Sequence, residues 1–196
     1  MRHGRPSGNF LSESRHMDQR AKTLVAELNA LEKSFEKQID TGLIIQLAER
    51  WLKNPASCVG EGTHWRTFRM EAPDLSLAIK IPQACFGAAE TNLKVWKSNM
   101  AKLNGQRIDL IPPFRVIPFR DQALFVMPYM SHGTSKMSPQ WLPLDVLKQS
   151  CESGLSALGL RNFDILQIGT VKGIPFVFDL SDIRAIETRS ENNSTR

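Results

Sequence analysis

The chain of 196 residues has few cysteines and histidines and lacks long apolar runs, and these absences argue against several classes of protein. It has 3 cysteines and no CxxC pair, which argues against a disulfide framework and a zinc site and favours a reducing compartment. Its 4 histidines are scattered, so they predict no metal cluster. No apolar run approaches the ~20 residues of a membrane-spanning helix, and we expect no membrane partner. The first residues also lack the apolar stretch of a secretory signal peptide.

Composition and charge narrow the class of protein and the kind of partner further. Apolar residues make up 41% and charged residues 23%, the balance of a globular protein with one core. The net charge of +5 suits an anionic partner such as a nucleotide, a nucleic acid or an acidic surface. Lys and Arg are spread along the chain without a nucleic-acid-binding motif, so nucleic acid is the least favoured partner. The Arg- and Ser-rich N-terminus is compatible with a disordered tail, an organelle transit peptide or a bacterial secretion signal.

Hydrophobic periodicity separates helices from strands. Apolar residues spaced three and four apart predict amphipathic helices, and short apolar or alternating runs between turn residues predict strands. The two leading helices are expected to pack on the rest of the chain, because their repeat is too short for a coiled coil. The predicted helices are 21–39, a short one that stops at Asn54-Pro55, 88–103 and 144–158. The predicted strands are 57–59, 64–71, 76–81, 114–119, 123–127, 165–168 and 174–179, with a turn around Asp121-Gln122.

Three features that can carry chemistry follow one another in the first half of the chain. Gly60 and Gly62 lie in a turn between two strands, where glycines let the backbone approach phosphate oxygens. Lys80 ends an apolar strand, and Glu90 comes early in the next helix. Each feature alone also has an ordinary structural explanation: a hairpin turn, a strand-end charge, and an acid that favours a helix N-terminus.

Two acids near the end of the chain complete the set. Asp164 follows a helix and a Leu-Gly-Leu run, and Asp179 closes the apolar run Pro-Phe-Val-Phe. An Asp at the end of a strand is often only a turn-former. The order of the residues along the chain therefore says more than any one of them.

Together and in this order, these residues resemble the motifs of the protein-kinase family: a glycine-rich loop, a strand Lys, a helix Glu, a catalytic-loop Asp and a metal-binding Asp. The resemblance covers roughly residues 57–183. The run 124–133 is similar to the hinge where adenine docks, with Met127 as the gatekeeper, the Pro128 carbonyl as an acceptor and the Met130 N–H as a donor. The resemblance implies that the protein binds ATP and Mg²⁺.

The resemblance also implies roles and exposes departures. Lys80, oriented by Glu90, would hold the α and β phosphates, Asp179 would bind magnesium, and Asp164 would orient or deprotonate the attacking hydroxyl. The family's His-Arg-Asp is Asn-Phe-Asp here, and no Asn stands five residues after Asp164, which leaves Gln167 as the nearest amide for magnesium. A rival register aligns Asp164 with the family's Asn and would make the protein a pseudokinase. The Leu-Gly-Leu run favours the first register.

The chain ends soon after Asp179, with no room for an activation segment or for the helices that hold a peptide substrate. In this it is most similar to the minimal kinases that bacteria inject into host cells by type III secretion, the HopBF effector family. Members of that family phosphorylate the host's ninety-kilodalton heat-shock chaperone. The resemblance therefore implies a secreted protein Ser/Thr kinase acting on a host protein. A small-molecule kinase of related fold and a pseudokinase or interaction scaffold are the alternatives.

The predicted fold class is α+β: a minimal two-lobed kinase-like fold with an N-terminal helical extension and a truncated C-lobe. The predicted parts are a disordered tail (1–20), a helical extension (21–55), an N-lobe (56–130), a reduced C-lobe (131–185) and a flexible tail (186–196).

Overall fold

The computed structural model describes residues 10–62, 64–83, 90–132, 141–163 and 166–186, with the backbone alone at 10–18, 90–92 and 131–132. The described residues are mixed α+β, as the sequence predicts, with antiparallel sheets of five, three and two strands. The helices are α1 (Phe10–Gln38), α2 (Thr41–Lys53), α4 (Glu90–Leu103) and α5 (Leu144–Ala157), with a 3-10 turn, η1, at Pro55–Ser57.

The five-stranded sheet has the order β1-β2-β3-β5-β4, and all its neighbouring strands are antiparallel. Its central strand, β3, is buried along its whole length, which explains why its sequence is almost entirely apolar. Lys80 is the exception in that strand, and its register partners are Thr67 and Phe125. The strands are β1 (Cys58–Glu61), β2 (Trp65–Met70), β3 (Leu77–Pro82), β4 (Arg115–Phe119) and β5 (Gln122–Pro128).

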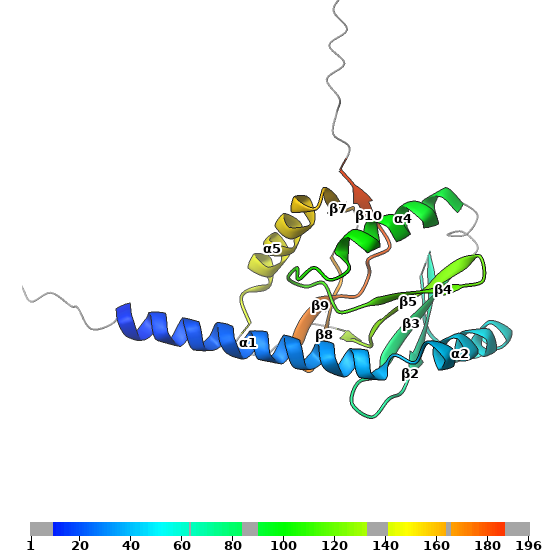
Figure 1. The fold of residues 1–196 in the computed structure, drawn as a ribbon, viewed down its shortest axis with the longest axis horizontal. Coiled ribbons are helices and arrows are strands. Elements are labelled where there is room, and N and C mark those ends of the chain that lie inside the picture. Colours follow the sequence, from blue (N-terminus) through cyan, green and yellow to red (C-terminus); the bar gives the residue numbers. More distant parts are fainter. Residues whose placement is uncertain (1–9, 63, 84–89, 133–140, 164–165, 187–196) are drawn as a thin grey trace, which may run out of the picture.

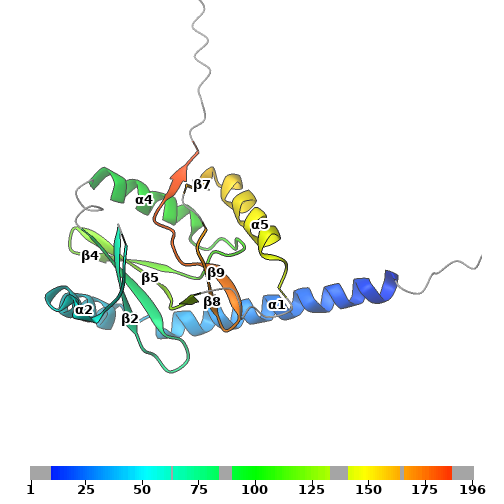
Figure 2. The ribbon, with the colours of Figure 1, turned by 180° about the vertical axis from the view of Figure 1, so that it is seen from behind.

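Helices cover both faces of this sheet (Figures 1 and 2). On the α4 face, the Trp96 ring lies 5.1 Å from that of Trp65 and 5.5 Å from that of Phe125, between ring centroids. On the other face, Trp51 of α2 stacks on Phe68 of β2 at 4.9 Å. Close aromatic pairs of this kind add to the stabilisation from apolar burial.

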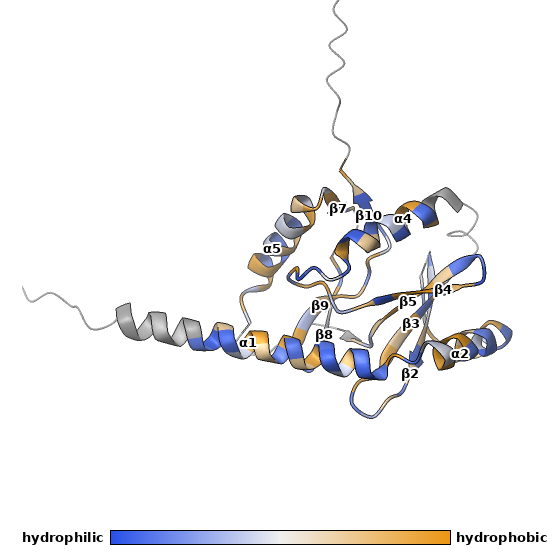
Figure 3. Ribbon diagram, viewed as in Figure 1, coloured by the Kyte–Doolittle hydropathy of each residue, from blue (hydrophilic) through white to orange (hydrophobic). Residues whose placement is uncertain are grey.

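The leading helices α1 and α2 are held to the body by apolar contacts. Phe35 of α1 and Ile44 and Ala48 of α2 are fully buried. Figure 3 shows hydrophobic and hydrophilic residues alternating along both helices, as expected for helices with one face on a core. No helix in the described part has both the length and the apolar character of a membrane span.

Strands β7 and β10 lie beside α5 and α4, whereas β8 and β9 lie nearer to α1 (Figures 1 and 2). A three-stranded sheet has the order β6-β8-β9, and β7 pairs with β10 in a short antiparallel ribbon. The Val177 N–H donates to the Leu110 carbonyl at 2.7 Å and so ties β9 to the loop after α4. The strands are β6 (Ser131–His132), β7 (Leu160–Asn162), β8 (Ile168–Val171), β9 (Ile174–Val177) and β10 (Ile183–Ala185).

Several predicted boundaries were wrong. Helix α1 begins at Phe10, so residues 10–20 are helical and not part of a disordered tail. Strand β8 lies three residues later than predicted, because the β8–β9 turn consists of Lys172 and Gly173 alone, both at positive φ (51° and 81°). Similarly, the β4–β5 turn is Arg120-Asp121, one residue earlier than predicted. The sequence pattern missed β6, β7 and β10, which are too short to show a period. The predicted tails over 1–9 and 187–196 lie outside the described residues.

Candidate functional site

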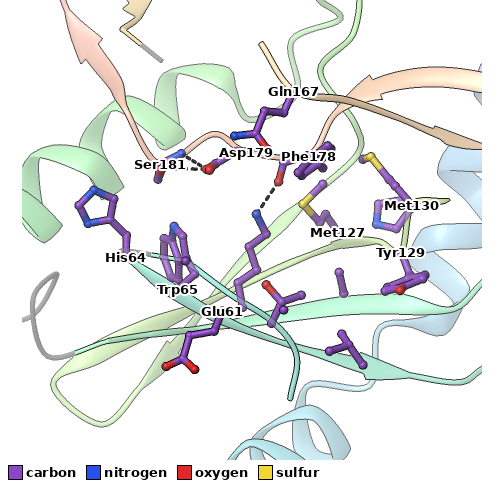
Figure 4. A pocket seen from close by; sticks show the side chains of 17 residues that line it. Glu61, His64, Trp65, Met127, Tyr129, Met130, Gln167, Phe178, Asp179 and Ser181 are labelled. Atoms are coloured by element: carbon purple, nitrogen blue, oxygen red, sulfur yellow. Dashed lines mark hydrogen bonds between the residues drawn. The ribbon is translucent and has the colours of Figure 1, made fainter. Parts of the chain in front are cut away.

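A cleft of about 370 Å³ opens between the five-stranded sheet and the chain that follows β9 (Figure 4). Its volume falls in the range of small-molecule sites in proteins. Side chains from β1, β2, β3 and the end of β5 form one wall, and Gln167, Phe178, Asp179 and Ser181 form the other. The lining residues are Val59, Gly60, Glu61, Gly62, His64, Trp65, Thr67, Ala78, Lys80, Met127, Pro128, Tyr129, Met130, Gln167, Phe178, Asp179 and Ser181.

Lys80 places a cation inside this cleft. The residue is only 7% exposed, and its Nζ donates a short hydrogen bond to the Phe178 carbonyl on the opposite wall, shown dashed in Figure 4. Burial lowers the pKa of Lys80 below its usual value, and the negative charge of Asp179 partly restores it. A buried ammonium with one nearby carboxylate favours a further anionic partner, since desolvated charges are costly unless they are paired.

Asp179 is held in a fixed orientation by the residue two places after it. The Ser181 N–H and hydroxyl both donate to Asp179 Oδ1, at 3.1 Å and 2.7 Å. On the chain before Asp179, the Phe178 N–H donates to the Gln167 carbonyl at 3.0 Å. Gln167 and Asp179 therefore belong to one hydrogen-bonded unit at the same wall, and both line the cleft.

The glycine-containing turn lies over the cleft and is closed by its own hydrogen bonds. The Gly62 N–H donates to the Trp65 carbonyl at 3.0 Å, and Gln83 Nε2 donates to the Gly62 carbonyl at 2.6 Å. In this conformation the Gly62 N–H is therefore used within the turn. A Cβ added at Gly62 would have no atom within 4 Å, so packing does not require glycine there.

The end of β5 supplies the apolar end of the cleft. Met127 is 1% exposed and is the register partner of Ala78, so both side chains lie beside the cavity. The Tyr129 N–H donates to the Ser76 carbonyl at 2.8 Å and is used within the fold. The buried Met130 follows it in the lining. This segment brings together the three residues that the sequence predicts for an adenine site.

Helix α4 fixes the backbone around Asp179 through two buried side chains. Trp96 Nε1 donates to the Leu180 carbonyl, and Asn99 Nδ2 donates to the Ile183 carbonyl, both at 3.0 Å. Neither Trp96 nor Asn99 is among the site residues that the sequence predicts. The available signal was a polar amide on the buried face of an amphipathic helix, where its hydrogen bonds must be met by the protein.

The structure thus places eight of the predicted site residues on one cleft: Gly60, Gly62, Lys80, Met127, Pro128, Met130, Gln167 and Asp179. Glu90 is the first residue of α4, but its side chain is not described, and Asp164 lies outside the described residues. Sequence reasoning did not assign Tyr129, Phe178 and Ser181 to the site. Tyr129 and Phe178 each adjoin a residue that it did assign, and Ser181 lies two residues after Asp179.

The cleft also offers oxygen ligands for a hard cation. Asp179 supplies a carboxylate and Gln167 an amide oxygen, and Mg²⁺ is usually held by one or two carboxylates together with substrate phosphates. In the part of the chain that the structure describes, no three His, Cys, Asp or Glu side chains gather as a metal cluster. The residues therefore fit a cation that arrives with a phosphate ligand better than a cation bound by protein alone.

No family model matches this chain, and no curated protein matches it either. What the cleft does is therefore inferred from its own residues.

Proposed function

We propose that the protein is an ATP-dependent protein Ser/Thr kinase of minimal form, which transfers the γ-phosphate of ATP to a protein hydroxyl. One observation carries the proposal. The Lys80 ammonium and the Asp179 carboxylate, from distant parts of the chain, line the same cleft as the β5 end segment. Phosphoryl transfer needs a cation, a metal-binding carboxylate and an adenine-binding end in one cavity. The two-lobed kinase arrangement is part of this proposal.

The nucleotide base would occupy the apolar end of the cleft. Ala78 and Met127 offer apolar surface to an adenine ring, and the Met130 N–H and the Pro128 carbonyl provide one donor and one acceptor. The Tyr129 N–H is already bonded to Ser76, which leaves Met130 as the hinge donor. A cavity with apolar walls and a few fixed polar groups is the usual form of a nucleotide-base site.

The triphosphate would run from this end toward Lys80. Burial lowers the pKa of Lys80, and a polyanion beside it would favour the charged form. The phosphates would add to the pairing that Phe178 and Asp179 already give the ammonium. Lys80 would hold the α and β phosphates. Gly60 lies in β1 and not in the turn that the sequence predicts for it. Gly60 and the turn that follows β1 at Gly62 would cover the phosphates after the hydrogen bonds of that turn rearrange.

Asp179 and Gln167 would hold Mg²⁺, which neutralises charge on the transferring phosphoryl group. The two hydrogen bonds from Ser181 fix the Asp179 carboxylate before the nucleotide arrives. Asp164 is proposed to orient the acceptor hydroxyl and accept its proton. Loss of one preorganised charged group of this kind costs ~10²–10³ in rate.

The acceptor and the cellular setting come from the resemblance alone. We propose that the protein is a bacterial effector that acts in a host cell on a host protein such as the ninety-kilodalton heat-shock chaperone. A small-molecule kinase would use the same nucleotide site, and a pseudokinase would bind nucleotide without turnover. These two alternatives differ from the main proposal in what becomes labelled.

The test is transfer of label from γ-labelled ATP by the purified full chain. Acceptors are the chaperone and a panel of other proteins, with sugars and aminoglycosides as a second panel. Label on protein Ser or Thr, lost in Asp164→Ala, Asp179→Ala and Lys80→Ala, supports the proposal. Asp74→Asn serves as the control acid, because exposed Asp74 pairs with Lys37 and does not line the cleft. Label on the small molecules alone supports the small-molecule kinase. Undiminished labelling by Lys80→Ala and Asp179→Ala contradicts the proposed site.

A further inference from the structure

The ribbon of β7 and β10 carries an unusual group of side chains outside the cleft. Arg161 of β7 is the direct register partner of Arg184 of β10. Phe163 follows Arg161 by two residues, and its N–H donates to the Asp182 carbonyl at 3.1 Å, so the pairing of the two chains continues past the end of β7. Residues two apart on an extended chain share a face. All three side chains therefore share one face of the ribbon.

The three side chains contact one another. The Arg161 and Arg184 guanidinium carbons lie 5.3 Å and 5.1 Å from the centre of the Phe163 ring. The ring is 52% exposed, the largest value among the large apolar side chains in the described part. Stacking on the ring orders both guanidinium groups, which reduces the entropy that each would lose on binding an anion.

A bound anion would relieve the repulsion between the two facing arginines. Like charges directly opposite each other in an antiparallel pair destabilise it. Arg184 forms an ion pair with Asp182, whereas no carboxylate within the described ranges forms an ion pair with Arg161. Among the described residues, the Arg161 guanidinium therefore has its planar set of donors available for an external carboxylate or phosphate, the groups that Arg binds in bidentate fashion.

The position of this surface along the chain relates it to the proposed reaction. Asp164, the proposed base, directly follows Phe163 in the sequence. An acceptor hydroxyl that reaches Asp164 belongs to a segment that passes close to Phe163. An extended segment advances about 3.3 Å per residue, so side chains one to three positions from the acceptor can reach the two arginines.

We propose that Arg161, Phe163 and Arg184 form a recognition surface for the acceptor segment, and that this surface selects an anionic side chain close to the phosphorylated Ser or Thr. The inference rests on the proposed kinase function. The anion is a carboxylate or a phosphate, which share the same chemistry toward Arg. The ring contributes apolar contact with the segment beside the anion.

The test uses a library of peptides with one central Ser and with Asp, phosphoserine or Lys placed singly at each flanking position. Phosphate transfer from ATP to each peptide is measured, with ATP hydrolysis in the absence of peptide as a separate signal. The wild type is expected to prefer an anion at one or two positions by about tenfold, the equivalent of one charge-assisted hydrogen bond. The Asp and phosphoserine arms show which anion is preferred.

Charge reversal supplies the decisive comparison. Arg161→Glu is expected to abolish the preference for an anion and to favour Lys at the same positions. The matched control is Arg120→Glu, because the Arg120 guanidinium also lies over a Phe ring, 5.3 Å from the centre of the buried Phe119 ring, but on the β4–β5 turn. We expect that variant to keep the wild-type preference.

The outcomes separate the two proposals. A wild type that hydrolyses ATP but labels no peptide, or labels peptides without a preference for an anion, contradicts the recognition surface and leaves the kinase proposal standing. The same holds if Arg161→Glu retains the wild-type preference. A wild type that neither hydrolyses ATP nor transfers its phosphate contradicts both.

Discussion

Replacement of Lys80 by Met separates the proposed ligand-binding role of this residue from its structural role. Met has a similar length and no charge, so the variant fills the same space in β3. Two effects on stability oppose each other. The Phe178 carbonyl loses its donor, which costs about 1–3 kcal/mol, and the cost of burying an ammonium disappears. We therefore expect the free energy of unfolding at pH 7 to change by less than about 2 kcal/mol, whereas phosphate transfer falls ~10²–10³.

The pH dependence of stability gives a sharper signature. Because the pKa of Lys80 is lower in the folded protein than in the unfolded chain, unfolding takes up a proton at pH values between the two. The contribution of Lys80 to stability therefore rises as the pH increases through that window, by at most about 1.36 kcal/mol per pH unit. Lys80→Met lacks this contribution.

The measurement is urea unfolding followed by tryptophan fluorescence at a series of pH values from neutral to about 10, for the wild type and the variant. The difference between the two curves isolates Lys80 from other titrating groups. Lys97→Met is the control, because Lys97 Nζ also donates to a backbone carbonyl, that of Gln122 at 3.2 Å, away from the cleft. Equal pH slopes for the wild type and Lys80→Met would refute the reasoning.

Substitutions elsewhere test the turn, helix α4 and the core. In Gly62→Ala the added Cβ meets no atom within 4 Å, so the free energy of unfolding should change by less than about 0.5 kcal/mol. MgATP affinity, measured by titration, should fall because the turn loses its close approach to phosphate. Unchanged affinity would contradict this. Trp96→Phe keeps an aromatic ring but leaves the Leu180 carbonyl without its donor. Urea unfolding should therefore show a free energy of unfolding lower by about 1–3 kcal/mol. An unchanged midpoint would exclude a contribution from that hydrogen bond. Burial raises the pKa of Cys151 to about 12, so this thiol should stay unmodified when the folded protein is treated with an aromatic disulfide reagent at pH 8. Peptide mapping should show that the half-buried Cys58 reacts under the same conditions. Equal modification of the two thiols would contradict the burial of Cys151.

The sequence predicted the α+β class and most elements because their signals are local. Strand β3 is a short apolar run, and α4 shows a clear apolar period around Trp96 and Met100. The start of α1 was missed because residues 10–20 carry many polar side chains and no clear apolar stripe. Strands of two or three residues, such as β7 and β10, depend on pairing between distant segments, which no local pattern records.

In the candidate site, too, the sequence predicts what depends on local signals and misses what depends on contacts between distant segments. The order of Gly60, Gly62, Lys80 and Asp179 along the chain predicted which residues would share a cleft. The hydrogen bond from Lys80 to Phe178 joins residues far apart in sequence, and it depends on how β3 and the end of β9 are placed in space. The bonds from Trp96 and Asn99 are of the same kind. The sequence could therefore indicate residues of the candidate site but not the contacts that hold them in place.

Nucleotide binding as a function of magnesium tests the central claim most directly, because it needs no knowledge of the acceptor. Calorimetric titration of ATP into the wild type should show affinity that rises strongly when Mg²⁺ is added. Asp179→Asn should lose this dependence on magnesium, while Asp182→Asn should keep it. Equal ATP affinity with and without Mg²⁺ in the wild type, or unchanged magnesium dependence in Asp179→Asn, would contradict a shared triphosphate site between Lys80 and Asp179.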